Sequence, residues 1–88
     1  MSMFTVYILY SPKYNKTYVG FTSDLDARIQ SHNELATKGW TLKFRPWTLI
    51  HTEQFDTKKD AMNREKWFKT GVGRDYISKN ILKKAPGI

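Results

Sequence analysis

The apolar, β-rich run Met3–Tyr10 constrains the fold of this chain more than any other segment, because its residue types are typical of a mostly buried strand. Ser11–Lys16 follows it with residues that are typical of a turn. Thr17–Thr22 again has the composition of a strand. The N-terminal part of the chain is therefore predicted to form a β-hairpin that contributes two strands to a sheet.

Helical and strand signals alternate along the rest of the chain. The sequence predicts a first helix that begins at a capping-box-like Ser23 and Asp26 and ends at about Leu35, followed by a loop over 37–45 and a third strand over Trp47–Phe55. A second helix is predicted over Lys58–Lys69, capped by Asp56 or Thr57 and stopped by Gly71. A last helix is predicted from about Asp75 to Lys84. This ββαβαα order predicts an α+β domain in which helices pack on a small sheet.

The length of the chain, 88 residues, is expected to give a single domain over 1–88. The chain contains no cysteine, which excludes disulfides, thiolate zinc sites and thiol nucleophiles. No apolar run is long enough for a membrane helix, and the N-terminus lacks a secretory pattern. We therefore expect a cytoplasmic protein with no membrane association.

The charge of the chain is strongly basic, with 15 Lys and Arg against 8 Asp and Glu and a net charge of +7. The excess is uneven, because residues 1–44 hold five basic and three acidic side chains whereas 45–88 hold ten and five. A basic chain of this kind is typical of proteins that bind a polyanion, most often nucleic acid. The alternative is that the charge serves only solubility.

Two polar side chains of the first helix lie next to its apolar stripe, which is marked by Leu25, Ile29 and Ala36. Arg28 and His32 are four residues apart, so both can lie over the same surface. The structural alternative is that they are edge residues whose polar ends reach water.

The second helix carries a carboxylate among apolar neighbours. Glu65 comes four residues after Ala61 and three before Phe68. An unpaired buried charge is costly, so Glu65 needs a partner. This partner is either a ligand or substrate group, or simply Lys69 or a nearby arginine in a salt bridge.

The hairpin brings a further pair of polar groups together. Tyr7 and Tyr18 lie on its two strands, and closing the turn near Asn15 places their phenols on one face, although tyrosines also pair in sheets for ordinary structural reasons. Gly20 leaves room for a backbone or a ligand to approach. Together, tyrosines, arginine, histidine and one carboxylate converging in a basic domain indicate phosphodiester cleavage.

These motifs resemble those of the GIY-YIG endonuclease superfamily. Thr5–Tyr7 and Tyr18–Gly20 resemble its paired signature, with Thr5 in place of a glycine and Val19 in place of an isoleucine. Leu25–Asn33 resembles the pattern of its first helix, and Ala61–Glu65 resembles the segment with its metal-binding glutamate. The chain is most similar to the small stand-alone branch, the URI or excinuclease C N-terminal-like proteins.

The resemblance implies a three-stranded antiparallel sheet flanked by helices, and a divalent-metal-dependent nuclease. It implies that Tyr7 activates a water with His32 accepting or orienting the phenolic proton, that Tyr18 positions the water or phosphate, and that Arg28 neutralises transition-state charge. Glu65 would hold one Mg²⁺ or Mn²⁺, weakly without substrate. Asn80 is a further candidate from the family's fifth motif.

A free phenol has a pKa of about 10 and is a poor base at pH 7, so Tyr7 requires help from Arg28, the metal or a neutral His32. We expect the five site residues to line one concave surface. The following residues are predicted to contact nucleic acid, Trp40 by stacking on bases: Lys13, Lys16, Gly20, Trp40, Lys43, Arg45, Lys66, Lys69, Arg74 and Lys79.

The leading functional hypothesis is a structure- or damage-directed DNA endonuclease, consistent with DNA repair and with RNA as a possible substrate. A protein partner could supply specificity, and the chain is expected to be a monomer or weak dimer. The alternatives are a non-catalytic nucleic-acid-binding module that keeps the fold, and a protein-interaction adaptor that uses exposed aromatic residues.

Overall fold

The N-terminal hairpin forms as predicted in the computed structural model, which describes residues 3–35 and 39–82. Strand β1 (Phe4–Ser11) pairs antiparallel with strand β2 (Lys16–Thr22). The turn between them contains Asn15 at a φ of 53°, a left-handed conformation that asparagine tolerates better than most residues. The Tyr10 hydroxyl donates a 2.9 Å hydrogen bond to Asn15 Oδ1 and holds the turn against the strand.

The third strand, β3 (Thr48–Phe55), pairs antiparallel with the other side of β1. The sheet therefore has three strands in the order β2-β1-β3, with β2 at an edge. This confirms the predicted α+β fold with a three-stranded antiparallel sheet. β1 is the central strand, so both of its faces must be covered.

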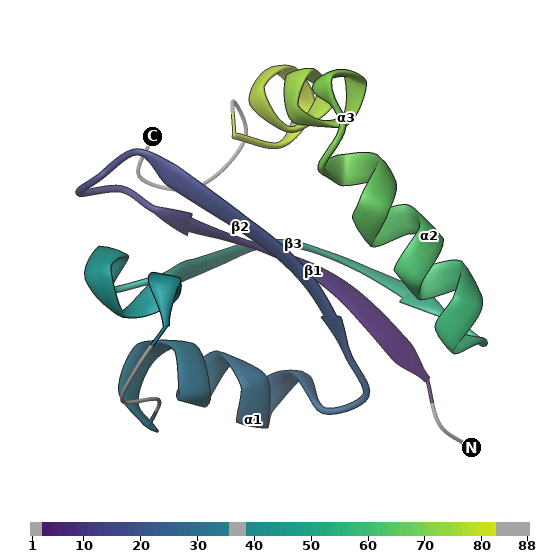
Figure 1. Cartoon of the computed structure of the whole chain (residues 1–88), viewed down its shortest axis with the longest axis horizontal. Helices are drawn as coiled ribbons and strands as arrows, with labels where there is room; N and C mark the ends of the chain where they lie inside the picture. The colour runs from purple at the N-terminus through teal and green to yellow at the C-terminus, as the bar shows by residue number, and fades with distance from the viewer. Residues whose placement is uncertain (1–2, 36–38, 83–88) are drawn as a thin grey trace.

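Helices cover both faces of this sheet, as Figure 1 shows. Side chains alternate along β1, so Val6 and Ile8 lie on one face and Tyr7 and Leu9 on the other. Helix α2 (Lys58–Phe68) and the helix that follows it pack on the Val6 face. Helix α1 (Leu25–Gln30) packs on the Tyr7 face, which is the face that carries the polar residues singled out in the sequence.

The start of α1 differs from the prediction by one residue. Asp24, not Ser23, caps the helix, because its side chain accepts a hydrogen bond from the Ala27 amide at 3.2 Å. After Gln30 the chain continues through a π-helical turn over Ser31–Leu35. Ala36, which was expected on the apolar stripe, lies outside the described residues.

The last helical segment begins earlier than predicted. Gly71 does not stop a helix but starts α3 (Gly71–Tyr76), which is capped by Thr70 and continues as a π-helical turn over Ile77–Ile81. A Cβ at Gly73 would lie 2.1 Å from the Trp67 carbonyl oxygen, so Gly73 allows α3 to pack directly against the end of α2. The predicted end at Lys84 lies outside the described residues.

None of the helices in the described ranges combines the length and the apolar character needed to cross a membrane.

Candidate active site

The phenol of Tyr7 is the centre of the candidate site. Tyr7 lies in the middle of β1, opposite Gly20 on β2, and only 2% of its surface is exposed. A Cβ at position 20 would lie 2.5 Å from Tyr7 Oη and 2.7 Å from Tyr7 Cζ. The space above Gly20 is therefore filled by the Tyr7 side chain, and the predicted contact of Gly20 with nucleic acid stays a prediction.

A chain of two hydrogen bonds begins at the Tyr7 hydroxyl. Tyr7 Oη lies 3.1 Å from Nε2 of His32, and Nδ1 of His32 lies 3.2 Å from Oγ1 of Thr41. His32 and Thr41 are each 8% exposed, so water does not readily replace either of these hydrogen bonds. Burial, followed by the charges of Arg28 and Arg45, lowers the pKa of His32, which keeps its imidazole neutral at neutral pH.

The protonation of Tyr7 is also fixed by its surroundings. Burial raises the pKa of the phenol well above its usual value, and the neighbouring Tyr18 and Glu65 add to the rise. Arg28 lowers this pKa but does not offset the burial. Tyr7 therefore keeps its proton and donates it to His32 Nε2, which places the imidazole proton on Nδ1 facing Thr41.

Tyr18 and Arg28 border the same group. The Tyr18 ring lies 6.2 Å from the Tyr7 ring and 4.8 Å from the His32 imidazole, measured between ring centroids. Arg28 is exposed on α1, four residues before His32, and its charge acts on both the phenol and the imidazole. Four of the five predicted catalytic residues thus lie on the α1 side of the sheet.

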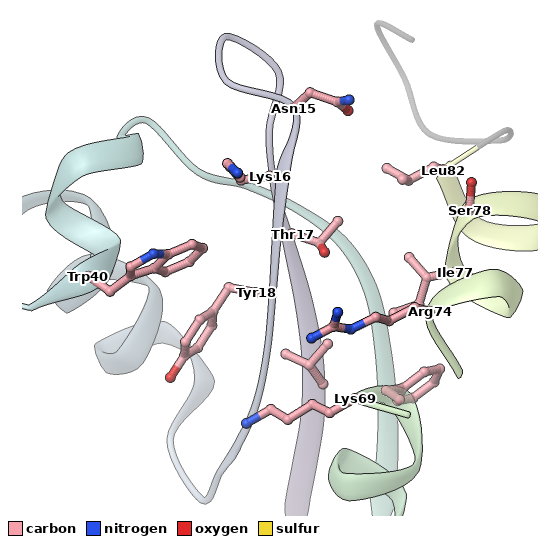
Figure 2. A pocket seen from close by; sticks show the side chains of 12 residues that line it. Asn15, Lys16, Thr17, Tyr18, Trp40, Lys69, Arg74, Ile77, Ser78 and Leu82 are labelled. Carbon is pink, nitrogen blue, oxygen red and sulfur yellow. The ribbon is translucent and has the colours of Figure 1, made fainter. Parts of the chain in front are cut away.

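Glu65 comes from the opposite layer. It belongs to α2, and its side chain is 16% exposed and forms a 2.7 Å salt bridge with Lys69. The Lys69 side chain extends toward the free edge of β2, where Tyr18 lies (Figure 2). The Glu65 charge nevertheless raises the pKa of the Tyr7 phenol. Glu65 therefore acts on the phenol from the α2 layer, whereas the other four residues lie on the α1 side, and a single concave surface lined by all five stays a prediction.

The donor set of the site fits only a weakly held metal ion. Glu65 is a single carboxylate, and the part of the chain that the structure describes has no group of three or more His, Cys, Asp or Glu residues placed to hold an ion. Mg²⁺ and Mn²⁺ favour oxygen ligands, and Mg²⁺ commonly keeps several of its waters. One carboxylate together with waters and substrate oxygens is compatible with such an ion.

Four of the ten predicted nucleic-acid contacts gather around one hollow. Lys16, Trp40, Lys69 and Arg74 line a cavity of about 570 Å³ along β2, together with Tyr18. The other predicted cations do not line it. Lys13 lies over the Tyr14 ring, Lys79 pairs with Asp75, and Lys43, Lys66 and Asn80 are exposed elsewhere on the surface.

Arg45 has a role that sequence reasoning missed. Its guanidinium donates hydrogen bonds to the carbonyl oxygens of Ser31 and His32, so it ties the segment before β3 to the end of the first helix. Asn33 completes this attachment by bonding both the amide and the carbonyl of Trp47. The structure thus assigns Arg45 to holding His32 in place. Neither this role nor that of Thr41 has a local sequence signal.

Comparisons with known proteins place the chain in a family. The family model described as the GIY-YIG catalytic domain matches residues 3–77. A UPF0213 protein of Staphylococcus haemolyticus is 39% identical over 70 residues, which cover 80% of this chain and 84% of that protein. Another, from Bacillus velezensis, is 44% identical over 55 residues, or 62% of this chain. The chain covers 56% of that protein and 58% of a Bacillus subtilis relative.

A solved structure is also similar. The solution NMR structure of a UPF0213 protein from Bacillus halodurans superposes with a TM-score of 0.54 at 27% sequence identity, and the match covers 97% of this chain and 88% of that one. The residues of the Tyr7 site, from both signature strands through Glu65, all fall within the matched family range. The chain belongs to the GIY-YIG catalytic domain family of nucleases.

Proposed function

We propose that this protein is a divalent-metal-dependent endonuclease that hydrolyses phosphodiester bonds in DNA. The observation that carries the proposal is the hydrogen-bonded series from Tyr7 through His32 to Thr41. Tyr18, Arg28 and Glu65 all act electrostatically on the phenol at its end. The reaction takes place in the cytoplasm on structured or damaged DNA, and specificity comes from this domain or from a partner protein.

The first step in the proposed mechanism is a coupled proton transfer. A phenol with a raised pKa does not act as a free phenolate, so it needs a base behind it. As water attacks the phosphorus, its proton passes to the Tyr7 oxygen while the Tyr7 proton passes to His32 Nε2. His32 becomes an imidazolium as negative charge develops on the phosphate, and this negative charge stabilises the imidazolium. Thr41 accepts from Nδ1 throughout and fixes the ring.

Residues on the exposed side of the site stabilise the negative charge on the phosphate. The Arg28 guanidinium presents a fork of donors that matches two phosphate oxygens. Its position one turn before His32 places it at the entrance of the site, where a phosphate would arrive. The Tyr18 hydroxyl orients the attacking water or the scissile phosphate. Glu65 would hold the Mg²⁺ or Mn²⁺ ion, whose chemistry is to stabilise charge on the phosphate and on the leaving 3′ oxygen.

The competing function is a nucleic-acid-binding module without catalysis. Such a module gains nothing from a negative charge beside its phosphate site, because the carboxylate repels the ligand. The salt bridge to Lys69 is the structural alternative for Glu65. Substituting each partner in turn separates these possibilities.

The substitution Glu65→Gln tests the proposed function. It preserves size and removes the charge, so Mg²⁺- or Mn²⁺-dependent cleavage of labelled DNA should be lost while metal-free affinity stays equal or rises slightly. Asp60→Asn, an exposed acid in the first turn of the same helix, is the matched control and should cleave normally. Cleavage is measured on gels and folding by circular dichroism.

Three outcomes contradict the assignment. Undiminished cleavage by a folded Glu65→Gln variant removes the metal role. Equal destabilisation of the fold by Glu65→Gln and Lys69→Ala, with normal cleavage in both, assigns the pair to structure alone. An inactive wild type that binds DNA tightly favours the binding module.

A further inference from the structure

The free edge of β2 forms the floor of the hollow shown in Figure 2. Tyr18 and Trp40 form one wall, on the α1 side of the sheet, and Lys69 and Arg74 form the other, at the end of α2 and in α3. The described strands leave the outer edge of β2 unpaired. We call this hollow the edge groove. Its volume of about 570 Å³ lies in the range of sites that hold organic ligands.

Trp40 is the exposed aromatic group of the edge groove. Its surface is 48% exposed, although its ring is surrounded by other rings. The Trp40 centroid lies 4.6 Å from Phe44, 5.9 Å from Trp47 and 6.4 Å from Tyr18, and the Tyr18 ring is inclined by only 29° to it. These neighbours hold the indole in place, so a group that stacks on its open face does not have to order it first.

The charges of the edge groove are all positive. Lys16, Lys69 and Arg74 line it, and none of the described residues that line it is acidic. The Lys16 ammonium lies 5.7 Å from the centroid of Phe44, next to Trp40. Lys69 is bound to Glu65, but the Lys69 side chain is 50% exposed, so its ammonium also has open space in which to meet a phosphate oxygen. An aromatic surface flanked by cations is typical of sites that bind single-stranded nucleic acid.

We propose that the edge groove binds an unpaired strand of nucleic acid, with one base stacked on Trp40 and the backbone along Lys16, Lys69 and Arg74. In a duplex the faces of each base are covered by its neighbours, so a base reaches an indole only when it is unpaired. Tyr18 lines both this groove and the Tyr7 site, which places an unpaired nucleotide next to the scissile phosphate. The inference specifies the substrate class of the proposed nuclease and rests on that function for its biological meaning.

A peptide that adds a strand to the β2 edge is a different occupant. Backbone pairing of that kind does not require cations on both walls or an indole on one wall. Duplex DNA would satisfy the cations but would leave Trp40 without a stacking partner. The charge and the aromatic surface together therefore favour an unpaired strand.

The test measures binding of the whole chain in EDTA, so that no metal-dependent cleavage occurs. A labelled single-stranded oligonucleotide and its duplex are titrated by fluorescence polarisation. The single strand should bind more tightly, and Trp40→Leu should weaken its binding by about 5- to 150-fold. Trp40→Phe keeps a flat ring and should retain most of the affinity. Tyr14→Leu removes an exposed aromatic residue that lies outside the groove and is the matched control.

Tryptophan fluorescence tests the binding mode directly. Stacking of a base on the Trp40 indole should quench emission when the single strand is added, and Trp40→Phe should lose this quenching while it still binds. Both variants are checked for folding by circular dichroism.

Three results would overturn the proposal: equal or tighter binding of the duplex, normal single-strand affinity in a folded Trp40→Leu variant, or unchanged quenching in Trp40→Phe. These results are independent of the nuclease assignment. Cleavage that requires Glu65 but does not depend on Trp40 would support the nuclease assignment and contradict the proposed role of the edge groove. Trp40-dependent binding by a protein that never cleaves would support the role of the edge groove and contradict the nuclease assignment.

Discussion

At the scale of single residues, the site depends on one missing side chain. Gly20 is the position at which β2 lets the Tyr7 phenol lie across the edge of the sheet. The phenol then meets His32, whose other nitrogen is held by Thr41. A change of about 1 Å at a reacting group can cost about 100-fold in rate. The position of the Tyr7 oxygen is therefore the most sensitive geometric feature of the site.

The substitution Gly20→Ala tests this feature. Its Cβ would lie 2.5 Å from Tyr7 Oη, so the ring must shift, which disturbs its hydrogen bond with His32. Cleavage should fall by about 100-fold or more, and the free energy of unfolding should fall by about 1–3 kcal/mol. Cleavage assays and urea denaturation measure the two effects.

Gly71→Ala is the matched control for Gly20→Ala, because nothing lies within 4 Å of the added atom. It should leave activity unchanged and stability equal or slightly higher. Normal activity in Gly20→Ala would show that the phenol does not need its observed position.

At the scale of elements, the connection between α1 and β3 carries several functions at once. Its 3₁₀ turn, Trp40–Phe44, supplies both Thr41 for His32 and Trp40 for the edge groove. The Trp47 indole donates a 2.9 Å hydrogen bond to the Thr41 carbonyl oxygen and fixes this turn. Trp47 is itself part of the core, with 4% of its surface exposed.

On the other face of the sheet, a charged contact ties β3 to α2. Arg64 bonds Glu53 at 2.8 Å and lies 4.5 Å from the ring centroids of both Trp67 and Phe68. Burial alone would raise the pKa of the Glu53 carboxyl, but hydrogen bonds from Arg64 and His51, with their charges, lower it. A carboxyl whose pKa is lowered in the folded state stabilises the fold above its unfolded pKa of about 4.3, and this stabilisation is lost as the pH falls through the folded value.

Glu53→Gln should therefore destabilise the protein at about pH 7, by about 1–3 kcal/mol, because Arg64 loses its charged partner. The difference from the wild type should shrink as the pH falls through the lowered, folded-state pKa of Glu53, below which the carboxyl is protonated in both states of the wild type. Urea denaturation at several pH values measures it. A difference that is constant with pH would contradict the ionic origin of the contact.

The elements that could be predicted from the sequence are those specified by local signals. The hairpin follows from a β-rich run, a turn and a second β-rich run, and Thr57 caps α2 as its position suggests. The early start of α3 was missed because it depends on how closely Gly73 packs against α2. Thr41 and Arg45 were missed for the same reason, since their partners are distant in the sequence and the residue types are common.

At the scale of the whole molecule, the two helical layers meet at the β2 edge. Tyr18 and Trp40 come from the α1 side, whereas Glu65, Lys69 and Arg74 come from the α2 side. A sequence motif names these residues but does not say from which layer each one reaches the site. The edge position of β2 is what allows both layers to contribute to one surface.

The net charge of +7 then predicts how binding depends on salt. Phosphate contacts release counterions, so the logarithm of the single-strand affinity should fall linearly with the logarithm of salt concentration, by roughly 0.7 for each contact. Three cations in the edge groove give a slope of about −2 or steeper. Lys16→Met should make that slope shallower by about 0.7, because one contact is lost, and the loss should be the same for every base sequence.

Lys58→Met removes the same charge at the opposite end of α2 from Lys69, outside the groove, and is the control. Both variants change the net charge of the molecule by the same amount, so a difference between their slopes isolates the local contact from the overall field. Equal slopes in the two variants would mean that the protein attracts nucleic acid by its total charge alone. A flat dependence in the wild type would point to an apolar interface instead, since such an interface releases no counterions.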